Sequence, residues 1–367
     1  MTTRSLALAA VTAVILAGCS GDKADSPSPT GTGSSGTTGN AAGSADAAKS
    51  QAPTASEPSV QLDLSAIKTT FANEPPSVPD KPGRLSRSKV ALGRKLYNET
   101  RLSRGGDVSC ATCHDVNNFG QDGKKLPTGT NGVAGTRNTP SSFNAHRQYA
   151  QFWDYRATTI EAQSTVGMLA EDQHGLKDEA EIEGILRGIP DYEKPFADAF
   201  PRDEQPITAK NVQLAIGAFQ RKLETRSRFD EFLDGKEDAL TAIEKKGLKA
   251  FMNATCTTCH AYRTLGGYQA QKLGNIRPFE TEDKGRMVVT GKKGDEYMFK
   301  VPNLLNVAKT GPYLHDGSIE SLEETVRFMA KHQVAIPVSE DQIKSIVAFL
   351  GSLTGELVDP SVIQESE

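Results

Sequence analysis

One five-residue pattern occurs twice in the chain, and it constrains the protein more than any other feature. The two copies are Cys110-Ala111-Thr112-Cys113-His114 and Cys256-Thr257-Thr258-Cys259-His260. A C-x-x-C-H run is the attachment signature of c-type haem, because its two thiols form thioethers to one porphyrin and the next imidazole binds the iron. The sequence therefore predicts two covalently bound haem c groups, each with the histidine of its own motif as the proximal iron ligand.

Two other uses of paired cysteines are compatible with the spacing inside each motif. The two pairs of a zinc ribbon usually lie within a few tens of residues of each other, whereas here they are far apart and each is followed by a histidine. A thioredoxin-like dithiol requires a βαβ context that the sequence does not show. The four motif cysteines and Cys19 are all five cysteines of the chain, which favours haem attachment.

The N-terminal residues predict export and a tether rather than a folded domain. Residues 1–18 combine a positive start with an apolar stretch too short to cross a bilayer, as a signal peptide does. Leu16-Ala17-Gly18-Cys19 resembles a bacterial lipobox, so we expect a lipid on Cys19; cleavage of an ordinary signal peptide near Ala17 is the alternative. Residues 19–59 contain no aromatic or large aliphatic side chain, which predicts a disordered linker.

The remaining chain is predicted to be all-α, with two cytochrome c-like domains that each carry one covalent haem c. We place the N-terminal domain at residues 60–224, the C-terminal domain at 225–353 and a tail at 354–367. A length of 367 residues is sufficient for two domains of ordinary size. The formal net charge is −4, so the chain has no excess of basic residues and no nucleic-acid partner is expected.

Helical periodicity supports this assignment in both halves. Residues 92–97 and 247–252 each predict a helix just before a haem motif, and the apolar spacing within 203–227 predicts another. Ser321 and Ser339 each begin a capping box that is followed by apolar residues at helical spacing. No alternating run is long enough to predict a major sheet.

Further motifs make the chain similar to the bacterial dihaem cytochrome c peroxidases over nearly all of residues 75–353. The matching stretches, in order, are Arg101-Leu102-Ser103-Arg104, Arg137-Asn138-Thr139-Pro140, Phe143-Asn144-Ala145, Gln151-Phe152-Trp153-Asp154, Ile189-Pro190-Asp191-Tyr192, Lys246-Gly247-Leu248-Lys249-Ala250-Phe251-Met252 and Gly311-Pro312-Tyr313-Leu314-His315-Asp316-Gly317. Together they are more specific than either haem motif alone.

The resemblance implies roles for residues outside the haem motifs. Met329 and His260 would ligate the iron of the C-terminal haem, and His114 would ligate the iron of the N-terminal haem, where peroxide binds. Trp153, the only tryptophan of the chain, would relay electrons between the haems. The family also has an inter-haem calcium ion, whose oxygen ligands here would be the Asn138 side chain and the carbonyls of Thr310 and Pro312.

The chain departs from the family at the peroxide-binding haem. Many members carry a histidine in the loop after the first haem motif, and this histidine ligates the resting iron until the enzyme is reduced. The corresponding residues 128–133 contain none. We therefore expect an open site that needs no reductive activation, with His146 and His174 as alternative sixth ligands.

Two residues are candidates for the proton-transfer group at this site. Gln163 matches the glutamine that the family places before its distal glutamate, and Gln173 or His174 stands near the position of that glutamate. Heterolysis of a peroxide needs a group that takes a proton from one oxygen and gives it to the other. Glu171 and His174 are the candidates for this role.

These features predict a dihaem cytochrome c peroxidase on the periplasmic side, anchored to the outer membrane through Cys19. It would reduce hydrogen peroxide to water with electrons from a small c-type cytochrome or a cupredoxin, and the resemblance also implies a homodimer. One alternative is a dihaem oxidase that modifies Trp or Tyr of a partner protein, like the enzyme that matures tryptophan tryptophylquinone. That branch typically has Tyr at the position of Met329. The other alternative is a non-catalytic dihaem electron carrier.

Overall fold

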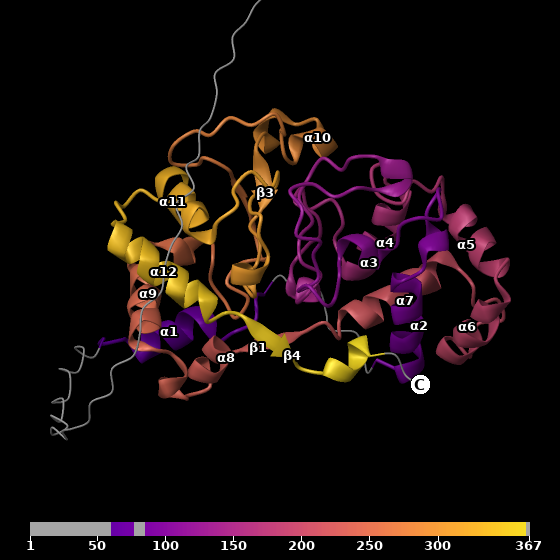
Figure 1. Cartoon of the computed structure of the whole chain (residues 1–367), viewed down its shortest axis with the longest axis horizontal. Coiled ribbons are helices and arrows are strands. Elements are labelled where there is room, and N and C mark those ends of the chain that lie inside the picture. Colours follow the sequence, from indigo (N-terminus) through magenta and orange to yellow (C-terminus); the bar gives the residue numbers. More distant parts are fainter. Residues whose placement is uncertain (1–59, 77–84, 365–367) are drawn as a thin grey trace, which may run out of the picture. The chain divides into compact units, whose positions relative to one another are not determined.

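The computed structural model describes residues 60–76 and 85–364, and this part of the chain is rich in helix with little sheet (Figure 1). The helices are α1 (Leu64–Phe71), α2 (Arg87–Tyr97), α3 (Cys110–Cys113), α4 (Ile160–Leu169), α5 (Glu179–Arg187), α6 (Glu193–Ala199), α7 (Ala209–Gln220), α8 (Arg228–Leu233), α9 (Ala242–Asn253), α10 (Met287–Thr290), α11 (Leu322–His332) and α12 (Glu340–Gly351). The strands are β1 (Thr225–Ser227), β2 (Ala270–Lys272), β3 (Met298–Lys300) and β4 (Gly355–Leu357).

The strands form two short antiparallel pairs, β1 with β4 and β2 with β3. Short 3-10 turns connect many of the elements. The expectation of a helical chain without a major sheet is therefore confirmed in the part of the chain that the structure describes.

The two halves repeat one helix crossing, in which α2 packs on α7 and α9 packs on α12 (Figure 1). At each crossing a glycine of the first helix touches the backbone of the second. A Cβ at Gly93 would lie 1.9 Å from the carbonyl oxygen of Ala215, and a Cβ at Gly247 would lie 1.8 Å from that of Ser345. The helices that were predicted before each haem motif are thus confirmed, and each is held at backbone contact with a later helix.

Two separate hydrophobic cores surround these crossings. The first contains Leu96 of α2, Tyr192 and Phe219 of α7. The second contains Phe251 of α9 and Phe349 of α12. Helix α1 packs into the second core through Ile67 and Phe71, although it lies in the N-terminal part of the sequence. Burial of large aromatic and aliphatic side chains, at roughly 1.5–3 kcal/mol each, stabilises both cores.

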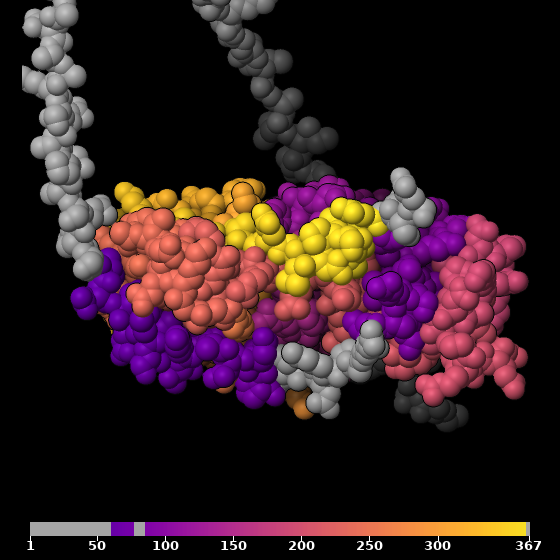
Figure 2. All heavy atoms as spheres, turned by 90° about the horizontal axis from the view of Figure 1, so that it is seen from below, coloured from indigo at the N-terminus to yellow at the C-terminus, as the bar shows by residue number. Residues whose placement is uncertain are grey.

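The described residues after α12, which include most of the predicted tail at 354–367, return to the first core. Strand β4 pairs with β1 in register, with Gly355 opposite Ser227. Val362 then belongs to the first core. Figure 2 shows this C-terminal segment in yellow on the surface, between the salmon residues around α8 and α9 and the indigo residues of the first core. The C-terminal part of the chain therefore contacts both cores, the second through α12 and the first through Val362.

Side-chain caps fix where the predicted helices begin. Ser339 and Gln342 form the reciprocal capping box that the sequence predicts for α12. At α11 the hydroxyl of Ser321 accepts from the backbone N–H of Glu324 at 3.1 Å. The return bond from the Glu324 side chain is not formed among the described residues, so this cap is half of the predicted box.

The predicted signal peptide (1–18), the lipidation site Cys19 and the linker (19–59) lie outside the described residues. Within the described ranges, no helix combines the length and the apolar character needed to cross a bilayer.

Candidate functional site

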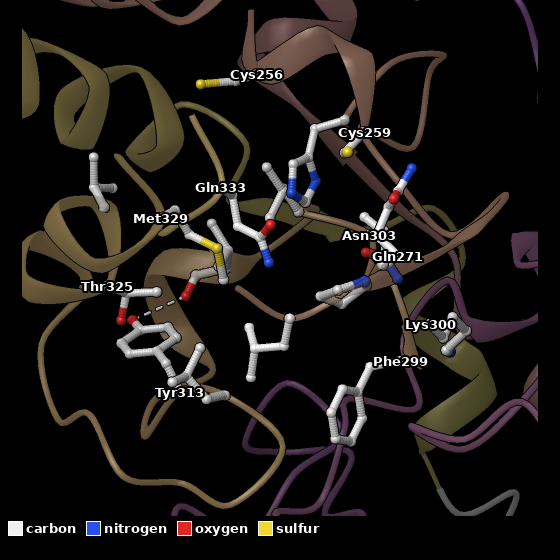
Figure 3. A pocket seen from close by; sticks show the side chains of 18 of the residues that line it. Cys256, Cys259, Gln271, Phe299, Lys300, Asn303, Tyr313, Thr325, Met329 and Gln333 are labelled. Carbon is white, nitrogen blue, oxygen red and sulfur yellow. Dashed lines mark hydrogen bonds between the residues drawn. The ribbon is translucent and has the colours of Figure 1, made fainter. Parts of the chain in front are cut away.

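Each haem motif lies in a cavity, and the larger of these two cavities is built around the second motif. It has a volume of about 440 Å³ and is lined by Cys256, Cys259 and His260, with Met329 contributed by α11. In Figure 3, Met329 and Thr325 lie on one side of this cavity and Cys259 and Asn303 on another. The predicted ligand pair of the C-terminal haem thus lines one cavity.

His260 is oriented as a metal-binding imidazole. Its Nδ1 lies 2.9 Å from the carbonyl oxygen of Leu265. Because a carbonyl can only accept, Nδ1 carries the proton and Nε2 keeps its lone pair for iron. Burial lowers the pKa of His260 to about 4, against the opposing effect of the Leu265 carbonyl. The imidazole is therefore neutral, which is the form that binds a metal.

Helix α11 directs its apolar face toward the cavity, and Leu322 and Val326 of this face also pack against the second core. Leu322, Val326 and Met329 line the cavity at helical spacing. Met329 is only partly buried. A porphyrin plane packs against apolar side chains of this kind. The residues present therefore fit a haem.

The smaller cavity is built around the first haem motif. It has a volume of about 280 Å³ and is lined by Cys110, Cys113 and His114. The Nδ1 of His114 lies 3.2 Å from the carbonyl oxygen of Gly120, which again leaves Nε2 for iron. The hydroxyl of Tyr97, at the end of α2, donates to the backbone carbonyl of His114 at 2.8 Å. The α2 helix thereby fixes the position of this histidine.

Three polar side chains meet on the other side of the smaller cavity. Gln163 of α4, Gln173 and His174 all line it. The Oε1 of Gln173 and the Nε2 of Gln163 both lie close to Gly167, at 3.0 and 3.6 Å from an ideal Cβ there. His174 is 8% exposed, and its Nδ1 lies 2.6 Å from the carbonyl oxygen of Leu102. The unprotonated Nε2 is therefore the nitrogen available to a ligand in the cavity.

Glu171 does not line this cavity. Its side chain is 71% exposed and forms an ion pair with Arg104, with Nη2 and Oε2 2.6 Å apart. The two distal candidates from the sequence are thus separated, because the chain turns between them. The structure brings His174, but not Glu171, together with Gln163 and the first haem motif.

The loop at residues 128–133 packs against the side of the smaller cavity that carries Gln173 and His174. The backbone N–H of Thr130 donates to the carbonyl of Gln173 at 2.8 Å, and the hydroxyl of Thr130 donates to Asp107 at 2.7 Å. At Gly129 a Cβ would lie 2.4 Å from the carbonyl oxygen of Asp172. The loop therefore packs directly against the segment that carries His174. His146, the other alternative ligand, does not line the cavity.

The two cavities share one wall. Trp153 lines both of them, and its indole N–H donates to the backbone carbonyl of Asn138 at 2.9 Å. The carbonyl of Trp153 in turn accepts from the backbone N–H of Lys300 at 2.8 Å. The sequence-predicted electron relay thus lies between the two sets of haem-attachment residues.

The residues expected to bind calcium lie beside this wall. Asn138, Thr310 and Pro312 all line the larger cavity. The side-chain N–H groups of Asn138 donate to the carbonyls of Lys124 and Lys125, at 2.9 and 3.3 Å, so its Oδ1 is not used in these bonds. In the described part of the chain, the carbonyl oxygens of Thr310 and Pro312 accept no hydrogen bond. Free oxygen atoms of this kind fit a hard cation.

The alternative uses of the cysteines do not fit this arrangement. The two pairs line different cavities, whereas a zinc ribbon brings its pairs to one ion. Burial raises the pKa of Cys110 and of Cys256 to about 12. A redox dithiol instead has an activated thiol with a lowered pKa.

Two site residues were missed by reasoning from the sequence. Lys300 lines both cavities, and Gln220 of α7 lines the smaller one with its Oε1 buried and without a hydrogen-bond partner among the described residues. Gln220 follows Phe219 in a helix whose spacing predicted only a core face. Lys300 sits in a short strand with no local signal of burial.

Two cavities, each with a C-x-x-C-H motif and joined by a wall with one tryptophan, define a helical c-type protein with two haem groups. A family model described as di-haem cytochrome c peroxidase matches residues 87–238. The cytochrome c551 peroxidase of Pseudomonas aeruginosa is 38% identical over 278 residues, which are 74% of this chain and 80% of that protein. The chain belongs to the di-haem cytochrome c peroxidase family, so it carries two haem c groups.

The same family includes proteins of another branch that resemble this chain. Methylamine utilization protein MauG of Methylorubrum extorquens is 34% identical over 320 residues, covering 84% of this chain and 90% of that protein. A solved structure of a MauG-like protein associated with microbial copper homeostasis superimposes with a TM-score of 0.70 at 28% identity. That match covers 78% of this chain and 95% of the other. Both branches therefore share this fold.

Proposed function

We propose that the protein reduces hydrogen peroxide to two waters with two electrons and two protons, and that a small c-type cytochrome or a cupredoxin supplies the electrons singly. The observation that carries the proposal is the wall shared by the two cavities, in which Trp153 lies between the two haem sites. Electrons enter at the site of His260 and Met329 and leave at the site of His114. Each site belongs to a cytochrome c-like domain with one haem. We place these domains at residues 60–224 and 225–353, except that α1 packs into the second core and Val362 into the first.

The distal side chains handle the protons of the peroxide. Cys110, Cys113 and His114 would hold the haem of this site, which would supply the electrons and a binding site for the peroxide. His174 accepts a proton at Nε2 from one peroxide oxygen and returns it to the other oxygen, because Nδ1 is already committed to Leu102. The amides of Gln163 and Gln173 orient the peroxide. Glu171 is too exposed to take part directly.

Replacing Trp153 tests the relay. Trp153→Phe keeps an apolar ring but removes the readily oxidised indole and the N–H bond to Asn138. We expect peroxide reduction by a reduced small cytochrome to slow by about tenfold or more, which is about 1.4 kcal/mol on the barrier. Both haems should remain bound. Tyr149→Phe, at an aromatic residue that lines neither cavity, is the control. Equal turnover in Trp153→Phe and wild type would remove Trp153 from the path.

The MauG-like relatives support a second candidate function, oxidation of Trp or Tyr on a partner protein. Met329 is the observation against it, since the resemblance associates that branch with Tyr at this position. The two functions differ in their electron source. Rapid turnover of peroxide with a reduced cytochrome favours the peroxidase, whereas dependence on a protein substrate would favour the oxidase.

We also propose one calcium ion bound by Asn138 and the carbonyls of Thr310 and Pro312. The free carbonyl oxygens beside the shared wall support this site. Removal of calcium by a chelator should lower the melting temperature and slow electron transfer between the haems, and added calcium should restore both. Asn138→Ala should abolish the response to calcium. An unchanged melting temperature after chelation would exclude the site.

The cellular setting is proposed from the sequence and the family. We infer a periplasm-facing homodimer that is tethered to the outer membrane by a lipid on Cys19. Cys19→Ala should release the protein from membranes while peroxide turnover is retained. Continued sedimentation of this variant with membranes would mean that another element anchors it. Sedimentation analysis of the released protein measures the oligomeric state.

A further inference from the structure

Lys300, the last residue of β3, carries an ammonium group that is buried between the two haem cavities. The residue is 5% exposed, and it lines both cavities. Its backbone N–H donates to the carbonyl of Trp153 at 2.8 Å, which holds it in the shared wall. Figure 3 shows Lys300 and Phe299 on one side of the larger cavity and Met329 on the other.

The polypeptide gives this ammonium no counter-charge. Its Nζ donates to Oε1 of Gln148 at 2.6 Å, which is a neutral acceptor, and no carboxylate of the described residues forms an ion pair with it. Asp154 acts on Lys300 from farther away, but its carboxylate is already bound by Arg137 and Arg156. Burial of an unpaired charge costs several kcal/mol.

The other charged groups around the wall also have partners of their own. Arg137 pairs with Asp283 at 2.6 Å, and Arg286 donates to the carbonyl of Asp154 at 2.8 Å. His315 stacks on Phe299 with ring centroids 4.2 Å apart. Burial therefore dominates, and it lowers the pKa of Lys300 to about 7 against the opposing effect of Asp154.

We propose that Lys300 binds a propionate carboxylate of a haem at the wall between the two sites. Each haem c carries two such carboxylates at one edge of its porphyrin. Because Lys300 lines both cavities, it can reach this edge of a haem in the larger or in the smaller cavity. The ion pair supplies the missing counter-charge and keeps the lysine protonated. It also anchors the porphyrin edge next to Trp153. A fixed positive charge here favours the reduced iron, because oxidation adds a further positive charge nearby.

The test is a pair of substitutions in the holoprotein, followed by spectroelectrochemical titration of both haems. Lys300→Gln removes the charge, and we expect the midpoint potential of one haem to fall. A tenfold change in the reduction equilibrium corresponds to about 59 mV for a one-electron couple. Lys300→Arg keeps the charge and should retain both potentials. Lys293→Gln, at a lysine whose side chain is 81% exposed, is the matched control.

Unchanged potentials of both haems in Lys300→Gln would overturn the proposal. If that variant does not fold, the wild type and Lys300→Arg are compared between about pH 6 and pH 9. A paired lysine stays charged over this range, so the two proteins should show parallel potentials. If the midpoint potential of the wild type drops below that of Lys300→Arg near neutral pH, the lysine is unpaired and loses its proton. That result would also overturn the proposal.

Discussion

The Nδ1–H of His174 donates to the carbonyl oxygen of Leu102 at 2.6 Å. The same segment holds the backbone of His174, because the N–H of Arg104 donates to the carbonyl of His174 at 2.9 Å. Because the Nδ1–H is used in this hydrogen bond, only Nε2 can contact a ligand in the smaller cavity. The side chain is thus suited either to transfer a proton or to occupy the sixth position of the His114 haem.

The spin state of the oxidised protein separates these two roles. Since the 128–133 loop has no histidine, we expect the N-terminal haem to be high-spin as isolated and to react with peroxide without prior reduction. Electron paramagnetic resonance of the ferric protein provides the measurement. In His174→Ala, turnover should fall by about 100-fold, the usual scale for loss of a general acid–base group, while the high-spin signal stays.

Two low-spin signals in the wild type, with a lag before turnover, would show a sixth ligand in the resting state. Recovery of the high-spin signal in His174→Ala would then identify His174 as that ligand, and recovery in His146→Ala would identify His146.

Glu171→Gln should leave peroxide turnover within about twofold of the wild type. The Glu171 side chain is 71% exposed and paired with Arg104 outside the cavity, and an exposed ion pair contributes about 0–1 kcal/mol. Gln163→Leu is the comparison within the cavity, and steady-state peroxide reduction should show a clear loss there. A large loss in Glu171→Gln alone would reverse the assignment of the proton-transfer group.

Met329→Ala should change only the haem of the larger cavity. A thioether ligand raises the potential of a haem, so a redox titration should show the high-potential wave lowered or lost, with the other wave unchanged. Met298→Leu alters a methionine of β3 that does not line the cavity, and it should leave both waves in place. An unaltered high-potential wave in Met329→Ala would exclude Met329 as a ligand.

Gly93→Ala should destabilise the protein by about 2–3 kcal/mol, because the added Cβ would meet the carbonyl oxygen of Ala215 and force α2 away from α7. Gly184→Ala is the control, since nothing lies within 4 Å of a Cβ at that exposed position of α5. There the loss of backbone freedom in the unfolded chain should stabilise the protein by about 0.5–1 kcal/mol. Denaturation of the two variants with haem bound should give opposite signs.

Glu99→Gln should destabilise the protein by about 1–3 kcal/mol at neutral pH, the scale of a lost charged hydrogen bond. Hydrogen bonds from Arg101 lower the pKa of Glu99 from 4.5 to about 2, and the Tyr192 hydroxyl also donates to it at 2.9 Å. A lowered pKa stabilises the fold above about pH 4.5, and that stability is lost as the pH falls toward 2.

The difference between Glu99→Gln and wild type should therefore shrink on acidification in denaturant titrations. Asp198→Asn removes an exposed carboxylate that pairs with Lys194, and it should have little effect at any pH. A difference for Glu99→Gln that is constant down to pH 3 would contradict the role of its charge.

The sequence by itself determined the cofactor chemistry and the helices that flank it. Attachment of haem depends on the spacing of Cys110, Cys113 and His114 within one turn, and helix starts such as Ser339 depend on caps three residues away. Both are local in the chain, so a linear pattern contains them. The helices at 92–97 and 247–252 were predicted in the same way, whereas their crossings at Gly93 and Gly247 came from the structure.

Only the tertiary structure decided which polar side chains face the cavities. Glu171 and His174 are three residues apart, yet one pairs with Arg104 at the surface and the other is fixed by Leu102 inside. Lys300 is drawn into the shared wall by its backbone bond to Trp153, although a lysine is ordinarily exposed. These outcomes depend on contacts between segments far apart in the chain, and such contacts leave no local pattern in the sequence.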